Sequence, residues 1–497
     1  MAAQPVWSVD PRTGKPREQV AVEATAEEID RAVRAAAATR EALADRTTRA
    51  ALLRIAADLL DEAGSHVIEA ADAETALGPV RLTGELARTT AQLRSFADVV
   101  DEGSFLDVRI DLPDATTTPP RPDLRRWKIP LGVVAVYAAS NFPLAFSVPG
   151  GDTASALAAG CPVVIKAHPD HPATSELCAS LLRRAAAKAG LPEDVVVLVH
   201  GFDAGVELVR HPLVAAAGFT GSVRGGRALF DAAASRPVPI PFHGELGSLN
   251  PVVITGAAVE ERAEEMGTGL AASMTMGQGQ FCTKPGFVLA PTGEAGDRFV
   301  TALTDAVSES EPGVMLDHRM RGAFLAGTSE RAELSGVGAP VLPGPGGEHT
   351  VNAGFLTVDA EALLEGGREA LLEECFGPVT VVARYDSREE ITAVLSRLPG
   401  NLTATLQMAD EDPEAATLLA ELTPLAGRVL VNGWPTGVAV AGAQHHGGPY
   451  PATTSTSTSV GATAIERWLR PVTYQSTPQH LLPPELRDDN PLGLPRR

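Results

Sequence analysis

The chain is poor in cysteine and in aromatic residues. Aromatic side chains make up 4% of 497 residues, and there are four cysteines: Cys161, Cys178, Cys282 and Cys375. None of them belongs to a Cys-x-x-Cys pair or lies in a histidine-rich stretch. The sequence therefore predicts neither a disulfide framework nor a metal site.

Basic residues are fewer than acidic residues. Lysine and arginine number 41 against 62 aspartates and glutamates, which gives a net charge of −21. A nucleic acid is excluded as a partner because a polyanion would be repelled by this charge. A small anionic substrate stays open, since one local cationic pocket is enough to bind it.

Long apolar runs are missing as well. No run approaches the length needed to cross a bilayer, so we expect no membrane association. The first ten residues lack a basic stretch followed by an apolar core, which predicts no signal peptide. We therefore expect a cytoplasmic protein.

The length favours two or three domains, and 44% hydrophobic residues are typical of a globular protein. Residues 25–103 are predicted to be helical, and Thr25 with Glu28 fits a capping box at their start. Residues 105–110 alternate like an exposed strand, and threonine and proline accumulate up to residue 127. This segment is predicted to be an excursion from the main domain.

From Leu131 onward, short apolar runs alternate with helical segments. Strands are predicted at residues 131–137, 162–166, 195–199 and 214–219, with helices at 150–159 and 174–189. A second series of this kind runs from residue 252 to about 431. Such alternation predicts an α/β fold with a doubly wound parallel sheet. The Thr/Ser tract 453–459 is predicted to be a surface loop.

Cys282 lies in the most informative stretch, Gly-Gln-Gly-Gln-Phe-Cys-Thr-Lys-Pro-Gly, at residues 277–286. A lone cysteine is usually a small buried hydrophobic residue. Here the flanking glycines disfavour a regular packed element and allow a ligand to approach the backbone closely. With Lys284 able to stabilise a thiolate, Cys282 is predicted to be a nucleophile.

Two further side chains could complete a reaction centre. Glu245 follows an apolar run and precedes Gly247, at a strand end where partial burial would raise its pKa toward that of a general base. Asn141 follows the strand 131–137 and could donate its amide N–H to an oxyanion. The alternatives are a solvated surface carboxylate and a turn residue before Pro143.

Two segments are candidates for binding a nucleotide. Lys166 ends the strand 162–166 and could reach ribose hydroxyls or a phosphate, although a lysine there is often only solvated. Residues 219–227 have a strand before them and a helix after them, which suits a phosphate at a helix N-terminus. They do not form a G-x-G-x-x-G fingerprint, so this signal alone is weak.

Five ordered motifs together carry a family resemblance: residues 164–166, 219–222, 245–248, 279–282 and 374–378. Over about residues 8–475 the chain resembles the aldehyde dehydrogenase family. The resemblance implies a doubly wound cofactor domain (1–104, 128–246 and 438–467) and a second α/β catalytic domain (247–437). It also implies an oligomerisation arm and tail (105–127 and 468–497) and a homodimer or homotetramer. Residues 483–497 are proline-rich and charged, and we expect them to be loosely ordered.

Within that family the chain looks most like 2-oxoglutarate semialdehyde (2,5-dioxopentanoate) dehydrogenases. The similar segments are residues 139–148, 150–160, 166–169, 432–437 and 447–454. The implied reaction is oxidation of 2-oxoglutarate semialdehyde to 2-oxoglutarate with NADP, or with NAD as the alternative cofactor. This subgroup also resembles NADP-dependent fatty-aldehyde dehydrogenases, so a broad-specificity enzyme for long-chain aldehydes is the alternative.

The resemblance assigns roles to further residues. Those implied to hold the cofactor are Lys166, His168, Gly221, Ser222, Gly226, Arg227, Leu246, Glu374 and Phe376. Phe142 and Lys284 are candidates for contact with the substrate. Lys284, or an arginine from another loop, would bind the acidic group of the substrate, and a solvated side chain is the favoured alternative for Lys284. Pro169 stands where NAD-preferring members carry a glutamate, which favours NADP, and the neighbouring Asp170 opposes this inference. Ser248 replaces a glycine of the family motif.

The implied mechanism is covalent. The Cys282 thiolate attacks the aldehyde carbon, and the Asn141 amide and the Cys282 backbone N–H stabilise the oxyanion, each contributing about 3 kcal/mol. Hydride transfer leaves a thioester, which water activated by Glu245 hydrolyses. Two other classes remain open: a catalytically silent binding homologue, and a hydrolase or acyltransferase that uses Cys282 without a cofactor.

Overall fold

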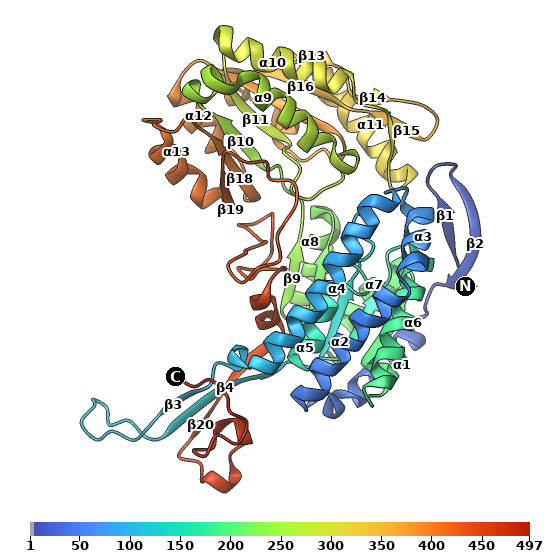
Figure 1. Ribbon diagram of the computed structural model, residues 1–497, viewed down its shortest axis with the longest axis vertical. Helices are drawn as coiled ribbons and strands as arrows, with labels where there is room; N and C mark the ends of the chain where they lie inside the picture. Colours follow the sequence, from blue (N-terminus) through green and yellow to red (C-terminus); the bar gives the residue numbers. More distant parts are fainter. Residues whose placement is uncertain (1–3) are drawn as a thin grey trace.

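The computed structural model describes residues 4–497 and contains two α/β lobes with a β-sheet arm at one end (Figure 1). A hairpin, β1 (Pro5–Asp10) and β2 (Lys15–Val22), precedes the helices α1 (Ala26–Ala38), α2 (Arg46–Glu62), α3 (Gly64–Thr75) and α4 (Pro79–Glu102). The predicted capping box is confirmed: the Thr25 hydroxyl accepts from the Glu28 N–H, and the Glu28 carboxylate accepts from the Thr25 N–H.

The middle of the molecule is a five-stranded sheet in the order β7-β6-β5-β8-β9, and all of its pairs are parallel. Its strands are β5 (Val133–Tyr137), β6 (Val163–Lys166), β7 (Val196–Val199), β8 (Val214–Thr220) and β9 (Phe242–Glu245). Val134 and Val136 pack in one core cluster, and Val133 packs in another. The predicted parallel sheet with two buried faces is confirmed.

Four helices connect these strands: α5 (Gly151–Ala159), α6 (Pro172–Lys188), α7 (Phe202–Arg210) and α8 (Val223–Ala234). The structure agrees with the predicted helices at residues 150–159 and 174–189 to within two residues at each end. The carboxyl ends of β5, β6, β8 and β9 carry the segments that the sequence singles out as candidate sites, as expected for an open parallel sheet.

The second lobe contains a seven-stranded sheet in the order β13-β16-β17-β11-β10-β18-β19, in which only the β13–β16 pair is antiparallel. Its strands are β10 (Pro251–Ile254), β11 (Phe287–Pro291), β13 (Gly338–Val341), β16 (Gly354–Asp359), β17 (Val379–Tyr385), β18 (Asn401–Gln407) and β19 (Ala426–Val431). The main helices are α9 (Gly256–Thr275), α10 (Gly293–Ser308), α11 (His318–Ala332), α12 (Arg388–Leu395) and α13 (Ala415–Leu422). The exact domain limits stay a prediction.

The arm is a three-stranded antiparallel sheet of β3 (Arg109–Asp111), β4 (Leu124–Pro130) and β20 (Leu469–Gln475), and it extends from the lower end in Figure 1. The two segments that the resemblance joined thus pair with each other. The predicted strand at residues 105–110 is wrong in its first half, because residues 104–106 form a 3-10 helix whose Phe105 and Leu106 are buried in the core.

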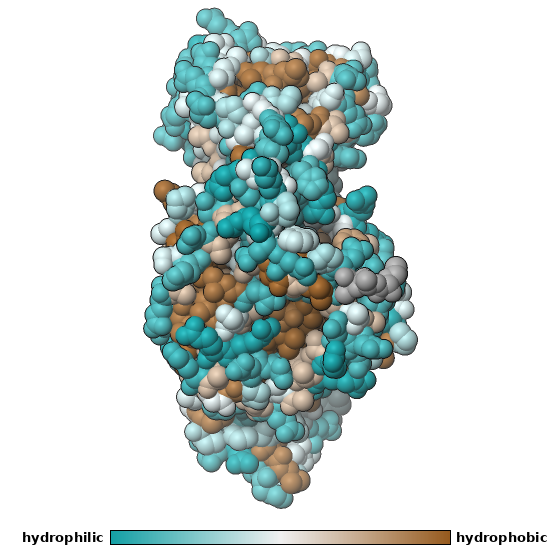
Figure 2. Space-filling view, turned by 90° about the vertical axis from the view of Figure 1, so that its right-hand side faces the viewer, coloured by the Kyte–Doolittle hydropathy of each residue, from teal (hydrophilic) through white to brown (hydrophobic). Residues whose placement is uncertain are grey.

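The last residues are better packed than their composition suggests. Leu486 and Leu494 are buried in the core of the first lobe, so the predicted loose order of residues 483–497 is wrong. The face in Figure 2 is hydrophilic over most of its area, with separate apolar patches near its middle. None of the helices between residues 4 and 497 has the length and apolar composition that crossing a bilayer requires.

Candidate active site

The loop that carries Cys282 follows α9 through a tight irregular turn. Gly277, Gln278 and Gly279 are consecutive and have φ of 56°, 57° and 62°. A Cβ on Gly279 would stand 2.3 Å from the carbonyl oxygen of Gly377. Glycine is therefore required at residue 279 both by its left-handed backbone and by this close approach.

Asn250 fixes the other side of the cysteine loop. Its Nδ2 donates to the carbonyls of Cys282 at 2.8 Å and Lys284 at 2.9 Å. The Ser248 hydroxyl donates to Asn250 Oδ1 at 2.7 Å and accepts from the Leu402 N–H at 2.9 Å. The serine that replaces the family's glycine therefore has a structural use, since it orients the side chain that holds the nucleophile.

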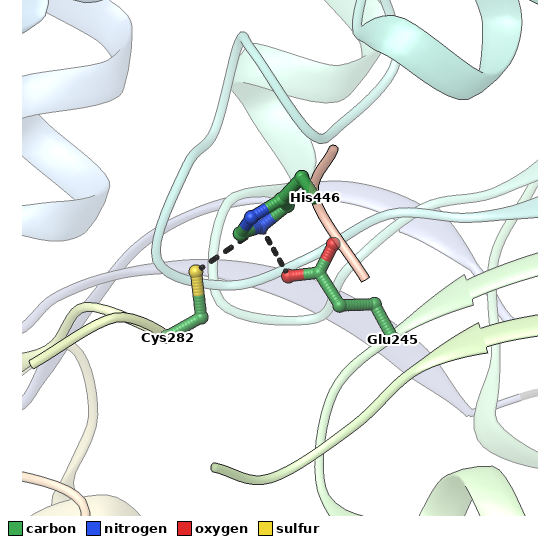
Figure 3. A group of neighbouring side chains, drawn as sticks. All are labelled: Glu245, Cys282 and His446. Atoms are coloured by element: carbon green, nitrogen blue, oxygen red, sulfur yellow. Dashed lines mark hydrogen bonds and ion pairs between the residues drawn. The ribbon is translucent and has the colours of Figure 1, made fainter. Parts of the chain in front are cut away.

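Three side chains meet at the centre of the site, with the imidazole of His446 between Cys282 and Glu245 (Figure 3). His446 Nε2 lies 3.7 Å from Cys282 Sγ and 2.9 Å from Glu245 Oε1. Ser459 Oγ donates to Glu245 Oε2 at 2.7 Å. The donor atoms of the three residues all lie within 4.8 Å of one another, a set that could also hold a metal ion.

His446 is the main residue that the sequence reasoning missed. It follows β19 in a stretch without regular secondary structure, and its N–H donates to Thr458 Oγ1 at 2.8 Å. The predicted loop at residues 453–459 is confirmed, but its placement at the surface is wrong at Thr453, Thr458 and Ser459, which are buried. The hydroxyls of this tract instead hold the histidine and the carboxylate in place.

The charges in the site differ from the sequence-based expectation for Glu245. Burial alone would raise the pKa of its carboxyl, but the charge of His446 and hydrogen bonds from His446 and Ser459 outweigh burial and lower it. The predicted rise is therefore wrong. Burial and the nearby Glu245 carboxylate raise the pKa of the Cys282 thiol well above its usual range. At neutral pH the arrangement thus pairs an ionised base with a protonated thiol.

Asn141 and Phe142 lie beside the cysteine loop. Asn141 is buried, and its Nδ2 donates to the carbonyl of Gln280 at 2.9 Å, two residues before the nucleophile. The Phe142 ring contacts Phe281 edge-on at 5.2 Å and Phe146 at 5.3 Å between centroids. These contacts place both residues near the thiol. Their roles toward an oxyanion and a substrate stay predictions.

Lys284 does not take the position that the sequence suggested. It is 2% exposed, so the solvated alternative is wrong, and its Nζ donates to the carbonyls of Cys375 at 2.9 Å and Val379 at 2.7 Å. With its ammonium engaged by these carbonyls, Lys284 does not offer the predicted cation to a substrate. It instead ties the cysteine loop to the Phe-Gly-Pro segment.

Several predicted cofactor residues gather around the start of α8. The Ser222 hydroxyl caps this helix by accepting from the Gly225 N–H at 3.2 Å. A Cβ on Gly226 would stand 2.1 Å from Cδ2 of Leu246, and one on Gly221 would stand 2.7 Å from the Phe219 ring. A side chain at either position would have to displace Leu246 or the Phe219 ring, so the two glycines allow the close packing of this helix start.

The remaining predicted cofactor residues lie on both lobes. Glu374 approaches Gly247 so closely that a Cβ there would stand 2.7 Å from its Oε2, and burial raises the pKa of Glu374 to about 7. Phe376 is half-buried. Lys166 ends β6, burial lowers its pKa to about 8, and its Nζ forms no hydrogen bond with residues 4–497. Its free ammonium suits the ribose or phosphate contact that the resemblance implies.

The predicted phosphate neighbours differ in charge. Burial, with the charge of His171, lowers the pKa of His168 well below its usual value, so its ring is neutral at neutral pH. Arg227 is exposed and pairs with Asp231 at 2.9 Å. Asp170 pairs with Arg319 at 3.0 Å, so the charge of Arg319 partly offsets the negative charge of Asp170, which would oppose the 2′-phosphate of NADP. His168 could therefore offer a hydrogen bond but no cation.

The comparisons with known proteins agree with this geometry. The model of the aldehyde dehydrogenase family matches residues 2–471. Alpha-ketoglutaric semialdehyde dehydrogenase 2 of Azospirillum brasilense is 50% identical over 90% of this chain and 86% of its own length. An alpha-ketoglutaric semialdehyde dehydrogenase of Acinetobacter baylyi is 44% identical over 99% of this chain and 95% of its own.

Solved structures share the fold at lower identity. A glyceraldehyde-3-phosphate dehydrogenase of Methanocaldococcus jannaschii, complexed with NADP, has a TM-score of 0.81 at 18% identity and covers 95% of this chain and 99% of its own. An NADP-dependent enzyme of E. coli has a TM-score of 0.80 at 24% identity, over 95% and 94% of the two chains. Together with the family match and the two relatives, these likenesses establish that the chain belongs to the aldehyde dehydrogenase family.

Proposed function

We propose that this chain oxidises 2-oxoglutarate semialdehyde to 2-oxoglutarate, with NADP as the hydride acceptor. The observation that carries the reaction class is the meeting of a thiol, an imidazole and a carboxylate at Cys282, His446 and Glu245. The substrate rests on the two relatives of that activity, at 50% and 44% identity. The family uses NAD or NADP, and NADP is the finer proposal.

Activation of the thiol is the first step. Because a carboxylate has no proton to donate, His446 Nε2 carries the hydrogen that bonds to Glu245 Oε1. The Cys282 thiol proton passes to Glu245, the ionised base of the pair. Once the thiolate forms, the same Nε2–H can donate to the sulfur, which lies 3.7 Å from Nε2, and stabilise its negative charge.

Attack by the thiolate on the aldehyde carbon turns the carbonyl oxygen into an oxyanion. The Cys282 backbone N–H makes no hydrogen bond within residues 4–497, so it is free to donate to this oxygen. The Asn141 amide has a second N–H besides the one that bonds to Gln280. These two donors stabilise the thiohemiacetal by about 3 kcal/mol each.

The nicotinamide cofactor, when bound, supplies the acceptor for the hydride that leaves the aldehyde carbon. Lys166, Ser222 and Glu374 are the residues proposed to hold it, with Phe376 near its nicotinamide end. Pro169, three residues after Lys166, is neutral and stands where a carboxylate would repel a ribose 2′-phosphate. This supports NADP as the cofactor. Arg319 adds positive charge beside Asp170.

Hydrolysis of the thioester completes the cycle. After the proton taken from the thiol has been released to solvent, the ionised Glu245 takes a proton from the attacking water, and the carboxylate product leaves Cys282 as thiolate. Hydrogen bonds from His446 and Ser459 fix both carboxylate oxygens of Glu245, so the base is oriented before the water attacks. Catalytic groups held in position in this way lower the barrier, because the entropy cost of orienting them is met before the reaction begins.

The test is an assay of reduced cofactor with 2-oxoglutarate semialdehyde and, separately, a long-chain aldehyde, each with NADP and with NAD. We expect the highest kcat/KM for the semialdehyde with NADP. Turnover of only the long-chain aldehyde would support the fatty-aldehyde alternative and would refute 2-oxoglutarate semialdehyde as the substrate. Cofactor binding without reduction of either would indicate a silent homologue.

We also propose that the chain forms a homodimer or homotetramer through the arm, residues 105–127 and 468–497. Its sheet has an edge at β20 that can add a strand from a second copy, whereas the edge at β3 is partly covered by the C-terminal residues, since the Ile110 N–H donates to the Arg497 carbonyl at 3.1 Å. Light scattering on the purified protein should give two or four times the mass of 51.7 kDa. A monomer at micromolar concentration would refute this proposal.

A further inference from the structure

Two arginines of α4, Arg81 and Arg88, lie two helical turns apart and face the aromatic residues beside the cysteine loop. The Arg81 guanidinium lies over the rings of Phe142 at 5.0 Å and Phe281 at 4.6 Å. Arg88 lies over the ring of Phe146 at 5.1 Å.

The same aromatic residues connect the arginines to the reaction centre. Phe281 directly precedes Cys282 in the chain, and the Phe146 ring lies 6.0 Å from the imidazole of His446. Through these rings the two guanidinium groups are linked to the residue before the nucleophile and to the histidine. Sequence reasoning did not single out either arginine.

Neither guanidinium is fully used by the protein. Within residues 4–497, Arg88 donates no hydrogen bond, and its buried Nη1 has no partner. Arg81 donates through Nη2 to the Asn141 carbonyl at 2.5 Å, but its buried Nη1 also has no partner. An unpaired buried donor is costly, and a charged one more so, which indicates that a ligand supplies the missing acceptor.

The one carboxylate of α4 between them does not fill this role. Glu85 lies between the two arginines in the helix, but its Oε1 accepts from the N–H groups of Leu144 at 2.8 Å and Ala145 at 2.9 Å. Among the described residues no ion pair joins Glu85 to Arg81 or Arg88 within 4.0 Å. Two cations therefore face one carboxylate, which leaves a positive charge at this place in a chain of net charge −21.

The electrostatic influence of Arg88 reaches the reaction centre. Burial lowers the pKa of Arg88, and the charges of Glu85, Cys282 and Glu245 counter this effect, that of Glu85 most strongly. Conversely, Arg88 is the cation that counters the rise in the pKa of the Cys282 thiol. The Phe146 ring, 5.1 Å from the Arg88 guanidinium and 6.0 Å from the His446 imidazole, places an anion bound to Arg88 beside the reaction centre.

We propose that Arg88, with Arg81 beside it, binds the carboxylate of an acidic aldehyde whose carbonyl carbon is attacked by Cys282. This inference rests on the proposed function and gives the residues that select the substrate. Across four carbon–carbon bonds the carboxylate of an extended five-carbon semialdehyde lies about 5 Å from its aldehyde carbon. A hydrogen bond of about 2.9 Å adds to this reach, so a cation beside the reaction centre fits the chain length. Arginine also matches a carboxylate with two parallel N–H donors.

The experiment compares two five-carbon aldehydes that differ only in the carboxylate, glutarate semialdehyde and pentanal, together with 2-oxoglutarate semialdehyde. In the Arg88→Leu variant we expect kcat/KM for the two acidic aldehydes to fall about 10- to 100-fold more than kcat/KM for pentanal, and this extra loss to appear chiefly in KM, because pentanal registers only the loss of the Arg88 charge near the thiol. Arg88→Lys keeps the charge without the fork and should retain part of the preference. An equal loss for acidic and neutral aldehydes would overturn the proposal.

Arg94 is the matched control on the same helix. Its guanidinium pairs with Asp58 and Asp61, both at 2.7 Å, on the solvent side. Arg94→Leu should therefore leave the ratio of acidic to neutral aldehyde unchanged. A fall in that ratio equal to that of Arg88→Leu would show an effect of net charge and would also overturn the proposal.

A second readout separates this inference from the proposed function. With pentanal as the reporter substrate, glutarate should inhibit the wild-type enzyme, and Arg88→Leu should raise its inhibition constant at least tenfold. This outcome would support the carboxylate site even if 2-oxoglutarate semialdehyde were not turned over, which would refute the proposed function alone. Equal inhibition of both proteins would overturn the role of Arg88.

Discussion

The contact between His446 and Glu245 leads to a quantitative prediction for the variant His446→Ala. The change removes one hydrogen bond to a buried carboxylate, the 2.9 Å bond to Oε1, and leaves the Ser459 bond to Oε2. A hydrogen bond to a charged group stabilises it by about 1.5–3 kcal/mol, and one pKa unit corresponds to about 1.4 kcal/mol. The pKa of Glu245 should therefore rise by about 1–2 units, since burial then acts with less opposition.

The sign of the effect on activity follows from the role of Glu245 as a base. Glu245 acts only when ionised, so the rate falls as pH decreases through its pKa. A higher pKa moves this acidic limb to higher pH. We would measure kcat against pH at saturating aldehyde for wild type, His446→Ala and the control His445→Ala, which removes the adjacent imidazole. If the acidic limb of His446→Ala coincided with that of the wild type, the assignment of His446 as the partner of Glu245 would be refuted.

Three further outcomes are expected. Glu245→Gln should slow the pre-steady-state formation of reduced cofactor and lower steady-state turnover about 100-fold, because the thiol and the attacking water both lose their base; a variant in which neither rate falls would contradict this. Lys284→Met should lower the free energy of unfolding by about 2 kcal/mol in denaturant titrations, since two carbonyls lose their donor, without changing the ratio of KM for acidic and neutral aldehydes. Pro169→Glu should weaken NADP binding at least tenfold and leave NAD binding within twofold in fluorescence titrations. If the variant and the wild type bound NADP with equal affinity, the proposed position of the 2′-phosphate would be wrong.

The sequence allowed the central sheet and its helices to be predicted because their signals are local. Apolar runs at residues 163–166 and 214–220 are short enough for strands and are bounded by helical patterns. The positions of Cys282 and Glu245 could also be predicted, since glycines and strand ends mark them in the sequence itself. That they meet in one site could not be obtained in this way; the resemblance implied it, and the structure shows it, with His446 Nε2 at 3.7 Å from Cys282 Sγ and 2.9 Å from Glu245 Oε1.

What the sequence could not give are contacts between distant segments. His446 lies about 200 residues from Glu245, in a stretch with no periodic pattern, so nothing local indicated its partner. The pKa of Glu245 was predicted with the wrong sign for the same reason, because the prediction included burial and omitted His446 and Ser459. Lys284 was considered as either solvated or substrate-binding, and the two carbonyls that bind it are more than 90 residues away. The pair His445-His446 beside the motif 447–454 was the one signal that could have indicated a role.

The late position of His446 and Ser459 has a consequence for how the enzyme is made. About 180 residues separate Cys282 from Ser459, and at about 5–20 residues per second a ribosome needs roughly 10–35 s to synthesise them. Strands β5 to β9 can pair during that interval, but Glu245 has neither of its hydrogen-bond donors until the last part of the chain arrives. The growing polypeptide therefore carries its nucleophile without the histidine that stabilises the thiolate, and the complete reaction centre can form only when synthesis is nearly finished.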